Sequence, residues 1–315
     1  MVTDGYAHRR PDLDTGIKCV LTSSLQKSLL GDPDFNETHD IGDFQRWMQE
    51  DSTAKLTKID DQTTHHDPHY YIPNGIRLGP EYGFYQLFFF FFPGIPVHIT
   101  NDRVYRHGTS HMSAVDKDGL AISLTSTVNW WFGSEVMTDK TGIVLNNQLD
   151  DFYIPKESDD PNIFPENRLR PGKRPLSTIS PTIITLDGEP YYITGAAGGP
   201  EIATTTLQGI VNVLDRGMDV FDALAEPRLH DQLFPDQTKV ENPFHSRKMT
   251  HNGYNKTVVE YLSGKGHNIT WFDSLGMSQS IRLLRDGTVE AVGEPRQRNS
   301  GGTIWSEQQG PRVEL

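Results

Sequence analysis

The chain contains little of what several common function classes require. It has one cysteine, Cys19, among 315 residues. A single thiol excludes a disulfide within the chain and every metal site built from several cysteines. Basic residues are also few, because 29 lysines and arginines stand against 42 aspartates and glutamates, which gives a net charge of −13. Proteins that follow a phosphate backbone carry the opposite balance, so we expect no nucleic-acid partner.

Long apolar segments are also missing. Residues 1–10 contain no apolar stretch of the kind found in secretory signals, and the sequence as written predicts neither a signal peptide nor a transmembrane span. Three Asn-X-Thr triplets, at Asn36, Asn255 and Asn268, are nevertheless candidate glycosylation sites. Together they keep a secretory, vacuolar or extracellular location open, with the targeting segment outside this chain, and membrane anchoring stays open as well.

The first third of the chain has two dissimilar parts. Residues 1–70 are polar and charged, with a helix expected over residues 44–54. Five consecutive phenylalanines follow at residues 88–92, inside a block that runs from about residue 75 to residue 106. The run is too short to span a bilayer and has neither helix nor strand periodicity. Two interpretations remain open, a buried strand and a translated intron retained in the sequence.

The remainder of the chain has an orderly pattern of strands and helices. Three Asp-Gly pairs, beginning at Asp118, Asp187 and Asp286, separate alternating or β-branched runs. Asp-Gly between such runs is the strongest short-range signal for a β-hairpin. Helical periodicity predicts helices over residues 202–214, 220–225 and 255–263. Hairpins followed by packed helices favour an α+β layered domain, for which 315 residues supply ample core.

The Gly108–Thr109 junction is the first candidate for chemistry. A threonine hydroxyl is a poor nucleophile unless a base lies beside it, and cleavage just before the threonine frees an α-amine that can be that base. The strand that follows alternates, and the hairpin returns a second strand beside it. One face is therefore expected to carry Thr109, His111, Ser113, Thr125 and Thr127.

Three polar motifs follow in order along the chain. Residues 146–151 read Asn-Asn-Gln-Leu-Asp-Asp, residues 177–181 read Ser-Thr-Ile-Ser-Pro, and residues 195–199 read Gly-Ala-Ala-Gly-Gly. Each alone is more often a polar turn or a loop before a helix. A second threonine pair at residues 63–64 is rejected as a nucleophile because Asp67-Pro68 follows it instead of a strand. The histidines at residues 65–69 have irregular spacing and are interpreted as a solvated loop, so no metal site is predicted.

Taken together, these motifs resemble the γ-glutamyltransferase (glutathione hydrolase) family of Ntn-hydrolases. The resemblance covers Thr109 to about Trp305 and extends more weakly into residues 1–70. It implies an α+β fold of the αββα layered-sandwich type, incomplete because the N-terminal part of the family's large subunit is missing. It also implies three segments: residues 1–74 as the end of the large subunit, residues 75–106 as an anomalous insert, and residues 109–315 as the small catalytic subunit.

The resemblance implies the following catalytic roles. Thr109 is the nucleophile released by autocleavage after Gly108, so the chain is made as a zymogen. Thr127 hydrogen-bonds the amine and hydroxyl of Thr109. The backbone N–H groups of Gly198 and Gly199 form the oxyanion hole, and glycine suits this role because it lets the backbone approach the reacting carbon closely.

It also implies the contacts to the substrate. Asn129, Gln148 and Asp151 hold the α-amino end of the γ-glutamyl group, and Ser177 and Thr178 hydrogen-bond its α-carboxylate. These residue types agree with their roles, because an ammonium group needs carboxylate and amide oxygens and a carboxylate needs short hydroxyl donors.

The implied enzyme cleaves the γ-glutamyl amide of glutathione or another γ-glutamyl compound through a γ-glutamyl-threonine ester. Water, an amino acid or a dipeptide then accepts the γ-glutamyl group. The expected assembly is a heterodimer of the chain's own cleavage fragments, with no cofactor and no metal. Two alternatives stay open, a truncated and inactive family member and a related Ntn amidase of the cephalosporin-acylase type. The amino-acid-binding set of Asn129, Gln148 and Asp151 argues against the amidase.

The chain departs from the family pattern at three places. Thr178 stands where the family has a second serine, which keeps the hydroxyl. Pro200 and Glu201 follow the glycine pair where the family has Ser-Arg, and the exchange of a cation for an anion predicts weaker substrate binding. No segment of residues 1–108 matches the motif that carries the family's carboxylate-binding arginine.

Overall fold

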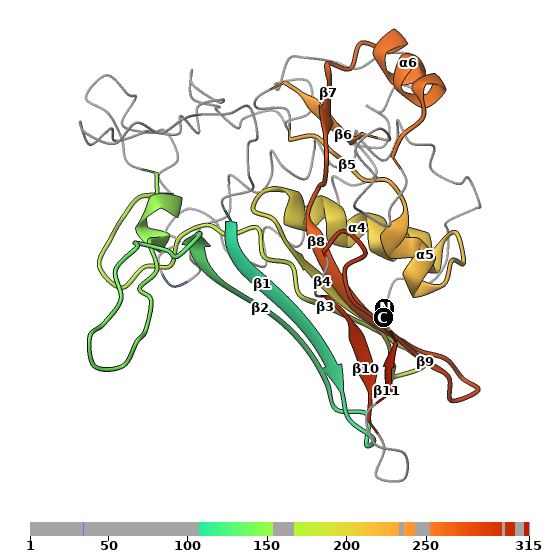
Figure 1. The fold of residues 1–315 in the computed structure, drawn as a ribbon, viewed down its shortest axis with the longest axis horizontal. Helices are drawn as coiled ribbons and strands as arrows, with labels where there is room; N and C mark the ends of the chain where they lie inside the picture. The colour runs from blue at the N-terminus through green and yellow to red at the C-terminus, as the bar shows by residue number, and fades with distance from the viewer. Residues whose placement is uncertain are drawn as a thin grey trace.

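The computed structural model describes Asp34 and residues 107–153, 167–232, 236–242, 253–297, 300–305 and 312–314. The expected helix over residues 44–54, the phenylalanine run at residues 88–92, the sequon at Asn36 and the histidines at residues 65–69 lie outside the described residues. Segments 1–74 (apart from Asp34) and 75–106 do so too, and the proposed three-segment division stays a prediction. Where the chain is described it has both strands and helices, which confirms the expected α+β class (Figure 1).

Thr109 lies near the start of a long antiparallel hairpin. Strand β1 (His107–Val115) pairs with strand β2 (Ala121–Trp130). The register places Thr109 opposite Thr127 and His111 opposite Thr125. The one-face arrangement expected from the alternation is therefore confirmed, because side chains directly opposite each other in a ladder point to the same side.

All three predicted Asp-Gly hairpins are present. The first joins β1 to β2, the second joins β3 (Thr182–Leu186) to β4 (Glu189–Ala197), and the third joins β8 (Met277–Leu283) to β9 (Val289–Val292). The turn glycines, Gly119, Gly188 and Gly287, have φ angles of +85°, +91° and +85°. Only glycine enters this left-handed region without steric cost, which explains why the motif predicts the turn so well.

A four-stranded antiparallel sheet in the order β3-β4-β8-β9 forms the centre of the described structure. Helices α4 (Glu201–Leu214) and α5 (Val220–Ala225) cover one face, and the β1–β2 hairpin lies against the other (Figure 1). Tyr192 of β4, Val213 of α4 and Leu224 of α5 form the core beneath the helices. Helix α4 follows β4 after a short connection, and this connection contains Gly198 and Gly199.

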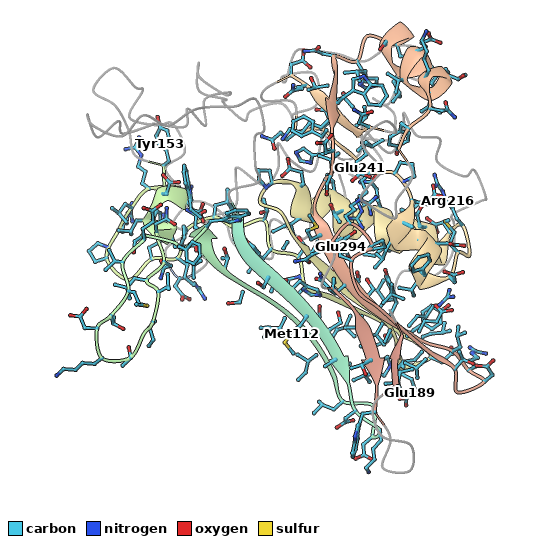
Figure 2. The ribbon with its side chains drawn as sticks, viewed as in Figure 1. Met112, Tyr153, Glu189, Arg216, Glu241 and Glu294 are labelled. Carbon is cyan, nitrogen blue, oxygen red and sulfur yellow. The ribbon has the colours of Figure 1, made fainter. Side chains whose placement is uncertain are left out.

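The contact between the hairpin and the central sheet is polar. Ser113 Oγ donates to the carbonyls of Ile193 and Gln279 at 3.4 and 3.2 Å, and Ser123 Oγ donates to the carbonyl of Thr194 at 2.8 Å. The apolar side chains of the hairpin face the other way, and Figure 2 shows Met112 pointing away from the sheet. About half of each of these outer side chains is exposed, at Met112, Ile122 and Leu124. The polar face that carries Thr109 is thus the face turned to the sheet.

The remaining elements form two smaller sheets and one helix. Strands β5 (Leu229–His230), β6 (Thr238–Glu241) and β7 (Ile269–Phe272) make one sheet, and β10 (Gly302–Ile304) pairs with β11 (Arg312–Glu314). Helix α6 (Lys256–Gly264) begins one residue later than expected, because Asn255 caps it by accepting from the N–H of Val258 at 3.0 Å. Within the described residues no helix has the length and apolar character to cross a membrane.

Candidate functional site

Two threonine hydroxyls meet at the start of the hairpin. The Oγ1 atoms of Thr109 and Thr127 lie 2.9 Å apart. Thr127 Oγ1 also accepts a hydrogen bond from the backbone N–H of Asn129 at 2.9 Å. This bond occupies one lone pair of Thr127 and leaves it able either to donate a proton to Thr109 or to accept one from it. Thr127 can therefore keep its contact with Thr109 while the charge on Thr109 Oγ1 changes.

The residue before Thr109 lies in a tight part of the ladder. A Cβ added to Gly108 would stand 2.2 Å from the carbonyl oxygen of Trp130. The register of the hairpin shifts between His107 and Thr109, so the ladder is irregular at this junction. Irregularities of this kind are frequent near active sites, where they redirect a side chain or end the pairing. Only glycine fits at position 108 without displacing the neighbouring strand.

The amide and carboxylate side chains expected to bind an amino group gather at the end of β2. Asn129 has a φ of +72°, a left-handed value that asparagine tolerates better than most residues. Asn147 holds the following loop to the strand, because its carbonyl accepts from Asn129 Nδ2 at 3.3 Å and its Oδ1 accepts from the N–H of Trp130 at 3.1 Å. Gln148 Nε2 donates to the Asp151 carboxylate within the single turn η1 (Gln148–Asp151).

A buried asparagine connects this set to the expected carboxylate-binding residues. Asn167 Nδ2 donates to the carbonyl of Asp151 at 2.8 Å, and its Oδ1 accepts from the N–H of Leu176 at 3.0 Å. Leu176 immediately precedes Ser177 and Thr178 in the chain. Sequence reasoning missed Asn167, because one asparagine in a polar loop has no pattern that distinguishes it from a solvated one.

The two hydroxyls at 177 and 178 are engaged differently. Thr178 Oγ1 donates to the carbonyl of Gly199 at 2.8 Å, so its proton holds the glycine turn. Ser177 Oγ accepts from the N–H of Ile179 at 3.2 Å, which leaves its own proton able to donate. Gly198 and Gly199 have φ angles of +132° and +64°. These two values require glycine and turn the chain sharply between β4 and α4.

Glu201, the second residue after the glycine turn, is paired inside the protein. Glu201 does not present a free negative charge to a substrate, because its side chain is 3% exposed and lies 2.6 Å from Lys239 Nζ. Burial raises the pKa of Glu201, but Lys239 and His230 outweigh this effect and hold the pKa below its usual range. The carboxylate is therefore ionised and paired inside the protein, at the first residue of α4.

A buried histidine lies two residues beyond Thr109 on the same face. His111 Nδ1 is 2.8 Å from Thr125 Oγ1, and its Nε2 is 3.1 Å from Ser113 Oγ. The ring fills the space that Gly195 leaves, since a Cβ on Gly195 would lie 2.2 Å from the ring carbon Cε1. Burial lowers the pKa of His111 to about 4, so the ring is neutral at neutral pH. The alternation placed His111 on this face, but nothing local in the sequence indicated that its ring packs against Gly195.

The neutral state of His111 predicts an acid-sensitive fold. As the pH falls from 6.5 toward about 4, the unfolded chain binds a proton at His111 that the folded protein excludes. The free energy of unfolding should therefore decrease across this window and be fully restored above it. Urea denaturation at several pH values should show a flatter profile for His111→Asn than for the wild type. Equal slopes in the two proteins would contradict this interpretation of the buried ring.

The described residues supply hydroxyls, amides, one carboxylate and backbone N–H groups at this site. Among them no three His, Cys, Asp or Glu side chains are grouped so that they could hold a metal ion. Hydroxyl, amide and carboxylate groups suit an amino-acid head group, and a glycine turn at a helix N-terminus suits a developing oxyanion. Hydrogen bonds through Asn147, Asn167 and Thr178 form a chain of contacts from the end of β2 to the glycine turn.

Comparison with known proteins identifies the family of this chain. The sequence profile of the family described as gamma-glutamyltranspeptidase matches residues 20–304. The glutathione hydrolase proenzyme of Arthroderma benhamiae is 40% identical over 287 residues, which are 89% of this chain and 42% of that protein. The chain spans less than half the length of the curated relatives compared.

Similarity to solved structures identifies the fold. A mutant of Helicobacter pylori gamma-glutamyltranspeptidase is 33% identical, with a TM-score of 0.53 over 59% of this chain and 99% of that chain. Cephalosporin acylase from Bacillus halodurans shares only the fold, at 21% identity and a TM-score of 0.66 over 99% of this chain and 46% of that chain. The fold is that of the Ntn-hydrolases, as the sequence motifs implied. On the profile match and the extent of these similarities, the chain belongs to the γ-glutamyltranspeptidase family.

Proposed function

We propose that this protein is a γ-glutamyl acyltransfer enzyme that acts on glutathione or a related γ-glutamyl compound after cleavage between Gly108 and Thr109. The observation that carries the proposal is the 2.9 Å contact between the hydroxyls of Thr109 and Thr127. It gives a strand threonine the polar partner that a nucleophilic oxygen requires.

The proposed reaction has two acyl-transfer steps. Thr109 Oγ1 attacks the γ-carbonyl carbon, and its proton passes to the α-amine that cleavage has freed. The carbonyl oxygen becomes an oxyanion, which the N–H groups of Gly198 and Gly199 stabilise. The carbon–nitrogen bond then breaks, the leaving amine takes the proton from the α-amine, and a γ-glutamyl ester remains on Thr109. Water or the amine of an amino acid or dipeptide attacks this ester and restores the free hydroxyl.

The same geometry supports a defined orientation of the substrate. Asn129, Gln148 and Asp151 lie at one end of the hairpin and supply the oxygens that bind an ammonium group. Ser177 keeps a proton to donate to the α-carboxylate. Thr178 contributes to substrate binding indirectly, because its hydroxyl donates its proton to the carbonyl of Gly199.

The proposed cleavage divides the chain into two fragments that stay together. We expect residues 109–315 to be the small catalytic subunit, bound to the fragment that precedes it as a heterodimer. The relative from Arthroderma benhamiae is named a proenzyme, which is compatible with such processing. A secretory or vacuolar location would make Asn255 the better glycosylation site, because its capping bond uses Oδ1, whereas Asn268 Nδ2 donates to the carbonyl of Asp236 at 2.8 Å.

The test is a pair of substrates that differ in one group. γ-Glutamyl-4-nitroanilide carries the α-amino group, and glutaryl-4-nitroanilide lacks it. A site built to bind that amine should prefer the first in kcat/KM by a factor on the order of 10⁴, because the analogue leaves the polar groups of the site unpaired. Equal rates, or a preference for the glutaryl compound, would favour the related amidase. Failure to hydrolyse either one would favour the inactive family member.

A further inference from the structure

Four charged side chains are buried together and form ion pairs with one another. We call them the charged quartet: Arg228, Glu241, Glu294 and Arg296. Each side chain is at most 4% exposed. Arg296 binds both carboxylate oxygens of Glu241 at 2.7 Å and Glu294 Oε1 at 3.1 Å, while Arg228 binds Glu294 Oε2 at 3.0 Å. Figure 2 labels two members of the charged quartet, Glu241 and Glu294.

Three members of the charged quartet bind the backbone of one short segment, residues 275–278. Glu241 Oε1 accepts from the N–H of Leu275 at 2.8 Å. Arg228 Nη1 donates to the carbonyl of Gly276 at 3.0 Å, and Glu294 Oε2 accepts from the N–H of Ser278 at 2.5 Å. The backbone of this segment is thus held by charge-assisted bonds, which are stronger than bonds between neutral groups.

The same segment packs directly against the glycine turn. A Cβ added to Gly198 would lie 2.8 Å from the Cα of Gly276, so the two backbones are in contact. Gly276 is held from its other side by α4, since a Cβ there would lie 2.2 Å from Thr205 Oγ1. Ser278 Oγ donates to the carbonyl of Gly195 at 2.8 Å. Residues 195 and 198 therefore both rest on the segment that the charged quartet holds.

Stability alone gives no reason for this arrangement. Taking four charges out of water costs several kcal/mol for each ion in typical proteins, and apolar side chains of similar volume often serve as well or better. What a charged network adds is fixed geometry, because every donor and acceptor has a defined direction.

We propose that the charged quartet positions the Gly198–Gly199 turn by holding residues 275–278 against it, with Glu294 as a positioning residue for the oxyanion-binding N–H groups. The catalytic consequence rests on the proposed function, whereas the structural coupling between the quartet and the turn does not. Loss of the Glu294 charge should loosen residues 195–199 while the amino-acid-binding residues at the end of β2 keep their places.

Glu294→Gln and Glu290→Gln make a matched pair for the test. Glu290 also pairs with an arginine, Arg282, at 2.8 Å, but its bonds go to Arg282 and to the N–H of Val220 and not to residues 275–278. With γ-glutamyl-4-nitroanilide, Glu294→Gln should lower kcat by between about 10- and 100-fold, since loss of a whole oxyanion donor costs about 10²- to 10³-fold. KM should stay within about twofold because ground-state contacts persist. Glu290→Gln should change neither constant.

Hydrogen exchange tests the coupling without relying on activity. The amides of residues 195–199 and of Glu201 should exchange faster in Glu294→Gln than in the wild type, while β1 and β2 should be unchanged in both variants. Unchanged exchange at residues 195–199 and at Glu201, or an equal effect from Glu290→Gln, would overturn the proposal. Faster exchange in Glu294→Gln, together with no turnover by the wild-type protein, would keep the positioning role and reject the proposed function. If Glu294→Gln does not fold, Ser278→Ala removes only the bond to Gly195 and should shift exchange and kcat in the same direction.

Discussion

Replacement of Thr109 by alanine is expected to leave the chain uncut and without turnover. In the proposed mechanism the hydroxyl of Thr109 is the attacking group in both the cleavage after Gly108 and the transfer of the γ-glutamyl group, so one substitution should remove both. Loss of a catalytic nucleophile lowers kcat by a factor on the order of 10⁶. Gel analysis of the purified protein should show one band for Thr109→Ala and two for the wild type, and hydrolysis of γ-glutamyl-4-nitroanilide should fall to background.

Two milder variants distinguish the hydroxyl from the shape of the side chain. Thr109→Ser keeps the hydroxyl and should still be processed, though more slowly. Thr127→Val keeps the volume but loses the 2.9 Å contact with Thr109, and it should slow both processing and turnover. Persistent two-band processing in Thr109→Ala would refute the assignment of the nucleophile.

Replacement of Arg296 by methionine should cause a large loss of stability. Arg296 binds both Glu241 and Glu294, and all three side chains are fully buried. Its removal breaks the ion pair with Glu241 and leaves Glu294 with Arg228 as its remaining arginine, and breaking a buried ion pair in this way typically costs about 3–5 kcal/mol. The midpoint of urea denaturation should move to correspondingly lower urea concentration with little change in the slope of the transition.

Arg285→Met is the matched control for this variant. Arg285 also pairs with a carboxylate, that of Asp187, but the two side chains are 75% and 74% exposed. Such surface pairs contribute between about 0 and 1 kcal/mol, so the control should unfold close to the wild type. Similar midpoints for the two variants would mean that the buried carboxylates of Glu241 and Glu294 do not depend on Arg296.

The features that could be predicted from the sequence are those with a local cause. Asp118-Gly119 sets a tight turn, and the period of two along each strand then brings Thr109 opposite Thr127. The helix limits follow equally local signals, such as the cap at Asn255. The motifs at residues 146–151 and 177–181 predicted hydroxyl, amide and carboxylate groups that the fold joins through hydrogen bonds.

The features that could not be predicted depend on contacts between distant parts of the chain. Arg228 and Glu294 are 66 positions apart, and Glu241 and Arg296 are 55 apart. No periodicity or motif links such positions, because their meeting depends on how two sheets and a helix pack. The same reason explains why the pairing of Glu201 with Lys239, on a distant strand, could not be predicted.

The central claim is tested most directly by the mass of the fragments after brief exposure to γ-glutamyl-4-nitroanilide and rapid quenching in acid. The expected result is a fragment that begins at Thr109, together with a second population heavier by one γ-glutamyl group, with the added mass mapped to Thr109. An uncut chain, or a γ-glutamyl group attached to any other residue, would contradict the assignment of Thr109 as the self-released nucleophile.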